Sequence, residues 1–163
     1  MQATVRVQAA DFDVAAEYAA LCGAGIDTGA VTMFVGRVRS AGDLAAVHGM
    51  HLEHYPGMTE RELGAIVQEA GRRWPLQAVR IVHRVGELSP GGQIVFVGVA
   101  GAHRAAAFAA CEFLIDWLKT RAPFWKRETS AGGASRWVEQ KASDRDRAAR
   151  WELPADRKPA REN

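Results

Sequence analysis

The residues best suited to chemistry gather in two stretches of the chain. One is Ala102-His103-Arg104, and the other runs from Lys119 to Glu128. A long helix is expected between them, so His103 and Arg104 would lie at its N-terminus. Free backbone N–H groups and the helix dipole favour an anion there, and arginine can bind an oxyanion through two hydrogen bonds. The alternative is that both side chains only solvate the helix end.

Lysine is rare in this chain, which draws attention to two positions. Only four of the 21 basic residues are lysines, and Lys119 and Lys126 lie seven residues apart. Nearby cations, Arg121 and Arg127, can lower a lysine pKa and so leave some neutral amine, which arginine cannot supply. The alternative for Lys119 is that it complements the dipole at the helix C-terminus. The pair is a candidate for proton transfer.

A second cationic pair, Arg37 and Arg39, ends an extended apolar segment that begins at Ala30. On a strand these two side chains share a face. They could bind phosphate, or they could form a solvated edge that discourages aggregation.

Two other kinds of site have weaker support. His48, His51 and His54 surround Glu53, but His51 and His54 face opposite sides of a strand and cannot easily share one metal ion. The triplet from Trp125 to Arg127 could stack a base beside a phosphate contact, but the formal net charge is only +2. We therefore expect neither a metal site nor a nucleic-acid interface.

A mixture of helices and paired strands must position these residues. Helices are expected behind an Asp13 cap, behind a Thr59–Glu62 capping box, and from about 102 to 120, where Phe108, Cys111, Ile115 and Leu118 would form the core stripe. Strands are expected at residues 30–39, 50–55, 79–85, 94–99, 124–129 and 136–139. This order favours an α+β domain over a doubly wound sheet.

Composition places the chain among soluble single-domain proteins. It has 163 residues, of which 48% are hydrophobic, enough for a core without metal or disulfide. There is no apolar run of roughly 20 residues and no secretory signal, and Cys22 and Cys111 match no metal or redox spacing. These features favour the cytoplasm. From Lys141 onward 12 of 23 residues are charged, which predicts a solvated helix that frays into disorder.

Several blocks of the sequence resemble the molybdopterin synthase catalytic subunit family. They are Phe34-Val35-Gly36-Arg37-Val38-Arg39, Leu52-Glu53-His54-Tyr55-Pro56-Gly57-Met58, His83-Arg84-Val85-Gly86, Ala102-His103-Arg104, and the run from Leu118 to Glu128. They cover roughly residues 12 to 140, in the family's order. Gly101, where the family often has serine, is a small departure.

The resemblance implies a fold, a reaction and partners. The fold would be an α/β hammerhead, a single domain over residues 1–140, with a partly disordered tail at 141–163. The reaction would insert two sulfurs into cyclic pyranopterin monophosphate, without a resident cofactor or metal. The sulfur would arrive as a thiocarboxylate on the C-terminal Gly-Gly tail of a small ubiquitin-like subunit. Two large subunits would form a central homodimer with one small subunit at each end.

The resemblance also assigns residue roles. Lys119 and Lys126 match the family's two essential lysines, and Arg39, His103 and Arg104 match its substrate-anion contacts. The substrate site is completed by residues adjacent to these in sequence, Arg37, Val38, Arg127 and Glu128. Phe34 and Trp125 could form pterin walls or could pack in the core.

Two other functions fit parts of the pattern. A non-catalytic adaptor for a ubiquitin-like tail would tolerate loss of Lys119 and Lys126. A phosphate-ester hydrolase would need a nucleophile or a metal-activated water, and the sequence shows neither a ligand cluster nor a Ser-His-acid arrangement. We rank both below the synthase.

Overall fold

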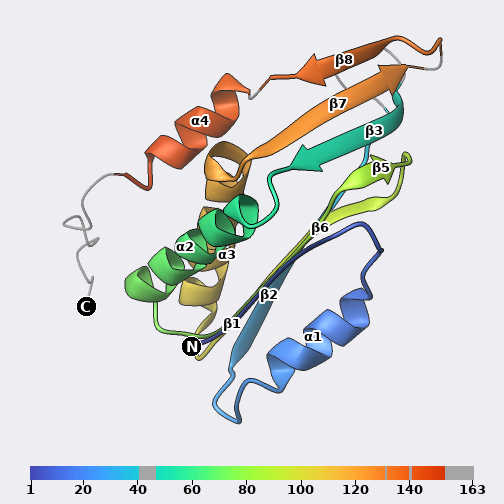
Figure 1. Ribbon diagram of the computed structural model, residues 1–163. Coiled ribbons are helices and arrows are strands. Elements are labelled where there is room, and N and C mark those ends of the chain that lie inside the picture. Colours follow the sequence, from blue (N-terminus) through green and yellow to red (C-terminus); the bar gives the residue numbers. More distant parts are fainter. Residues whose placement is uncertain (41–46, 131, 140, 153–163) are drawn as a thin grey trace.

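The computed structural model describes residues 1–40, 47–130, 132–139 and 141–152. Over these residues the chain forms two four-stranded sheets and four helices (Figure 1). The α+β prediction is confirmed. No helix in this part of the chain is long and apolar enough to cross a membrane.

The larger sheet has the strand order β1-β4-β6-β2. Its strands are β1 (Gln2–Gln8), β4 (Leu76–Arg84), β6 (Gln93–Gly101) and β2 (Ala30–Arg37), and only the β1–β4 pair is parallel. Alternate side chains point to opposite faces. Val82 and Phe96 pack beneath α1 (Val14–Cys22), whereas Ile81 and Val97 pack beneath α2 (Met58–Arg73) and α3 (Arg104–Arg121).

The smaller sheet has the order β5-β3-β7-β8 and is antiparallel throughout. It comprises β5 (Gly86–Leu88), β3 (Val47–His54), β7 (Phe124–Ser130) and β8 (Ser135–Val138). Met50, Leu52 and Leu88 from its inner face form a small core with Val38. Ile94 packs against both this cluster and the main core, so it joins the two sheets.

The predicted start of α1 is confirmed, and that of α2 is wrong. Asp13 Oδ1 accepts a hydrogen bond from Ala15 N at 2.8 Å. At α2, Glu60 Oε2 accepts from Gly57 N at 2.7 Å, so the cap lies two residues earlier than a Thr59–Glu62 box. Gly57 has φ +80°, which turns the chain directly into the helix. Thr59 is buried inside the first turn.

The long helix α3 ends before Pro123 as expected, but its core stripe is only partly correct. Cys111 and Leu118 are buried, and burial raises the pKa of the Cys111 thiol to about 12. Phe108 is 63% exposed, because the buried arc follows Ala107, about 100° around the helix, and continues through Phe113 and Leu114.

The charged tail begins with a helix that packs against α3. This helix is α4 (Ala142–Ala149; Figure 1). It buries Ala148, and the Trp151 ring behind it meets the rings of Trp74 and Phe113 at 5.7 and 5.6 Å. The domain boundary at residue 140 stays a prediction. The expected disorder at the chain end falls on residues 153–163, outside the described residues.

Candidate active site

A cavity of about 780 Å³ lies where the two sheets meet the C-terminal end of α3. Apolar side chains from both sheets and α3 line most of it. Its polar side chains are Arg37, Arg39, His83, Lys119, Lys126 and Arg147. The fold therefore brings together the two predicted lysines and the predicted arginine pair, although these four residues come from three separate parts of the chain.

Lys126 is held by a buried carboxylate. β7 places Lys126 and Glu128 on the same face, and Lys126 Nζ lies 2.6 Å from Glu128 Oε1. The Glu128 side chain is only 2% exposed. A buried carboxylate is costly unless it is paired, so this ion pair fixes both partners. Glu128, predicted as a substrate contact, lies behind Lys126 and is not among the lining residues.

Lys119 reaches the cavity from the last turn of α3. Its Nζ lies 3.5 Å from Asp144 Oδ1 on α4, and its side chain is 45% exposed. The amine is therefore more accessible than that of Lys126, which is 33% exposed.

The arginine pair occupies the end of β2. Arg37 donates from Nε to the Gly91 carbonyl at 2.9 Å, and Val38 N donates to Gly92 O at 2.9 Å. Gly91 has φ +82°, a conformation that favours glycine. Arg39 is exposed and also lines a second hollow of about 710 Å³ beside Pro90. The Val38 side chain, predicted as a substrate contact, is buried in the core, so only its backbone faces this region.

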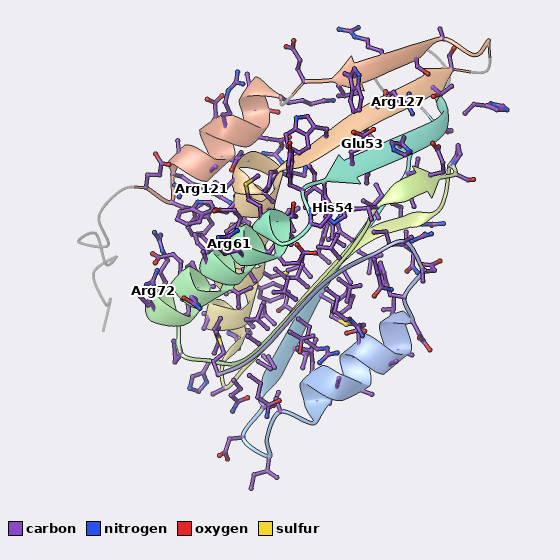
Figure 2. The ribbon with its side chains drawn as sticks, in the orientation of Figure 1. Glu53, His54, Arg61, Arg72, Arg121 and Arg127 are labelled. Carbon is purple, nitrogen blue, oxygen red and sulfur yellow. The ribbon has the colours of Figure 1, made fainter. Side chains whose placement is uncertain are left out.

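The remaining predicted contacts do not join the cavity within one chain. His103 and Arg104 begin α3, and Lys119 follows in its last turn, about 23 Å away along the helix axis. Arg127 lies on the outer face of the smaller sheet, with its guanidinium 5.6 Å from the Trp137 ring (Figure 2). Its Nε is buried without a hydrogen-bond partner among the described residues.

Of the two aromatic residues considered as pterin walls, only Phe34 lines the cavity, as a pterin-wall residue would. Trp125 is 44% exposed and packs edge-on against Tyr55 at 5.7 Å, outside the cavity. It therefore lies outside the core and does not line this cavity.

His83 is a cavity residue that the sequence did not single out. Its Nδ1 lies 2.8 Å from the Arg84 carbonyl, and its ring stacks on Phe124 at 3.8 Å. A carbonyl can only accept, so Nδ1 carries the proton and Nε2 is an acceptor. Burial lowers the pKa of His83 to about 4, so the ring is neutral at pH 7. Alternation in residues 79–85 indicated a buried position but not what it faces.

Arg147 is the second cavity residue that the sequence missed. It comes from α4, within the segment expected to be a solvated tail. Arg147 reaches the cavity only because α4 packs against α3. The charge pattern of residues 141–163 does not indicate this packing.

The histidines considered as metal ligands bind different carboxylates. His51 Nδ1 lies 2.6 Å from Glu87 Oε1, whereas His54 Nε2 lies 3.9 Å from Glu60 Oε1. No group of three or more possible metal-ligating side chains occurs in the part of the chain that the structure describes.

The cavity combines apolar walls, cationic groups and amines beside carboxylates. Such a site can hold a small anionic ring compound and transfer protons to or from it. Guanidinium groups suit phosphate or carboxylate, and the neutral imidazole offers a fixed acceptor.

Comparison with known proteins identifies what this chain resembles. The sequence model of the family described as MoaE protein matches residues 7–121. The molybdopterin synthase catalytic subunit of Pseudomonas aeruginosa is 57% identical over 148 residues, covering 91% of this chain and 98% of that protein.

Solved structures give the same result. The molybdopterin biosynthesis MoaE protein from Burkholderia ambifaria has a TM-score of 0.80 at 51% identity, covering 94% of this chain and 100% of that one. Molybdopterin synthase from Staphylococcus aureus has a TM-score of 0.76 at 27% identity, covering 82% and 96%.

Proposed function

The chain belongs to the MoaE family of molybdopterin synthase catalytic subunits, enzymes of molybdenum-cofactor biosynthesis, and we propose that its cavity is the site of sulfur transfer. The substrate is cyclic pyranopterin monophosphate, and two sulfurs are inserted to form the dithiolene of molybdopterin. The observation that carries this proposal is the opening of Lys119 and Lys126 onto one apolar cavity that also receives Arg39.

The sulfur donor is a small ubiquitin-like subunit that ends in a Gly-Gly thiocarboxylate. The name catalytic subunit, which the Pseudomonas relative carries, fits an assembly with a second kind of subunit. A glycine tail has no side chains and can enter a narrow cavity as an extended chain.

The two lysines have different environments and so suit different tasks. Lys126 is oriented by Glu128, so it can donate a hydrogen bond to an oxygen that gains charge during attack by sulfur. Lys119 is more exposed and lies at a longer distance from Asp144, so it is the better group for proton transfer.

The anion site is completed by a second copy of the chain. Within one copy, His103 and Arg104 lie near the start of β2, because Ala30 pairs with Gly101, whereas Arg37 ends β2. β2 is an edge strand of about 26 Å, which is close to the length of α3. A two-fold axis near the middle of β2 would therefore bring His103 and Arg104 of one copy beside the cavity of the other.

Exposed apolar side chains support this face as the homodimer interface. Met33 on β2 is 41% exposed, and Phe108 on the neighbouring α3 is 63% exposed. A strand that forms the edge of the sheet among the described residues, flanked by such side chains, favours self-association. The complete assembly is then a homodimer with one small subunit at each end.

Reconstitution tests the proposed function. The protein is mixed with the cyclic substrate and the thiocarboxylated small subunit, and sulfur in the product is followed by mass spectrometry. We expect transfer with the intact partner and none with a partner that lacks its last two glycines. Equal transfer with the truncated partner would contradict delivery by the tail.

A further inference from the structure

We infer that Arg147, on α4, is a further oxyanion-binding residue of the cavity, a role that rests on the function proposed above. Its ligand is either the phosphate of the substrate or the C-terminal carboxylate of the carrier tail, since both present the same chemistry to a guanidinium group.

Most cationic side chains of the cavity have a hydrogen-bond or ion-pair partner, whereas Arg147 does not have one among the described residues. Lys126 is paired with Glu128 and Lys119 with Asp144, and Arg37 donates to the Gly91 carbonyl. In contrast, neither the Arg39 nor the Arg147 side chain has a hydrogen bond or ion pair with any described residue.

The cavity lining contains no acidic side chain among the described residues. The positive charge of these two arginines is therefore uncompensated, and it faces a partly enclosed space in which an anion is favoured over water.

α4 presents Arg147 from a fixed position. Asp116, which is buried, accepts from Arg150 Nη2 and from Trp151 Nε1, each at 2.8 Å. The Trp151 ring packs among aromatic rings of the core. The helix that carries Arg147 is thus anchored immediately after its C-terminus.

The orientation of α4 gives a second constraint. Asp144 and Arg147 are three residues apart and share one face of the helix. Asp144 meets Lys119 at the cavity, so the same face directs Arg147 toward it. Arginine suits this position because its planar guanidinium can bind two oxygens of a phosphate or carboxylate at once.

The test compares Arg147→Gln with Arg61→Gln by isothermal titration calorimetry. Arg61 is exposed on α2 and does not line the cavity, and its side chain has no partner among the described residues (Figure 2). Its substitution therefore removes the same charge outside the cavity. Three probes are titrated into the full chain: inorganic phosphate, a peptide that ends in a Gly-Gly carboxylate, and the same peptide ending in an amide.

We expect Arg147→Gln to weaken binding of phosphate or of the carboxylate peptide by about 10-fold, as for the loss of one charge-assisted contact. Arg61→Gln should stay within twofold of wild type. If only the affinity for phosphate falls, Arg147 binds the phosphate of the substrate. If only the affinity for the carboxylate peptide falls, Arg147 binds the tail, and the affinity for the amide peptide should then be unchanged by the substitution.

Equal affinity of wild type and Arg147→Gln for both anionic probes, or no binding of either probe by wild type, would overturn the inference. These titrations need no turnover. A chain that binds anions through Arg147 but transfers no sulfur would refute the proposed function alone. Active sulfur transfer with unchanged anion binding in Arg147→Gln would refute this inference alone.

Discussion

Lys126 Nζ and Glu128 Oε1 lie 2.6 Å apart on the inner face of β7, with the carboxylate almost fully buried. The strand's two-residue period places both groups on one side. The amine that faces the cavity is therefore oriented by a carboxylate that does not itself line the cavity.

This ion pair predicts the effect of Glu128→Gln. The amide keeps the shape but loses the charge, so Lys126 should become less well oriented and single-turnover sulfur transfer should slow by about 10-fold. The free energy of unfolding in urea should fall by about 1–3 kcal/mol. Glu53→Gln, on the outer face of the same sheet, is the control and should change neither quantity (Figure 2). Wild-type rates in Glu128→Gln would show that the pair is only structural.

Arg39→Ala should weaken binding of the cyclic substrate by roughly 10- to 150-fold, because one charge-assisted contact is lost. The fold should survive, since Arg39 is exposed and has no partner among the described residues. Calorimetric titration of the substrate measures the change, with Arg61→Ala as the matched loss of charge. Equal affinity in Arg39→Ala and wild type would leave Arg39 as a solvated edge residue.

His83 predicts a pH dependence of stability. Its pKa is about 4 in the folded protein, because burial disfavours the charged ring, against 6.5 when unfolded. The unfolded chain therefore binds more protons between these values, so the free energy of unfolding falls as pH drops from about 6.5 to 4. The part due to His83 is about 3 kcal/mol.

Urea unfolding at pH 7 and pH 4.5 tests this dependence in wild type and in His83→Phe. Phenylalanine does not titrate and can retain the stacking on Phe124. The loss of stability on acidification should be about 2 kcal/mol smaller in His83→Phe. The same loss in both proteins would mean that other groups cause the acid sensitivity.

A cavity shared between two copies predicts complementation. Lys119→Ala and His103→Ala homodimers should each be nearly inactive, because every cavity lacks one group. After subunit exchange, a mixed dimer has one cavity with both defects and one with none. Random mixing should therefore restore about a quarter of wild-type activity. If Lys119 and His103 acted within one chain, each cavity would keep a defect and mixing would restore nothing.

Local sequence patterns predicted most of the helices and strands, although not β1 or β5. They predicted less well which residues each element buries. The Asp13 cap and the strands at residues 79–85 and 94–99 each depend on neighbouring residues, and these predictions are confirmed. Phe108 was misassigned because the buried face of α3 depends on where α2 and the larger sheet pack. The α2 cap was misplaced because Gly57 adopts a backbone conformation that the Thr59–Glu62 spacing does not reveal.

The residues of the candidate site were likewise predicted only in part. Lys119 and Lys126 are noticeable in a chain with few lysines, and the resemblance supplied their roles. Arg147 and His83 were missed because their relation to the cavity arises only from tertiary packing. His103 and Lys119 lie at opposite ends of α3, so one cavity can contain both only if a second copy supplies one of them. The sequence alone does not indicate this arrangement.

The most direct test of sulfur transfer in this cavity is single turnover of Lys119→Arg with saturating thiocarboxylated partner, read by the mass of the product. Wild type should give a product that contains two sulfurs. Lys119→Arg keeps the positive charge but cannot supply a neutral amine, so the rate should fall by about 10²–10⁴ while partner binding stays nearly intact. A Lys119→Arg rate within a few-fold of wild type, or a wild-type product without added sulfur, would contradict the account.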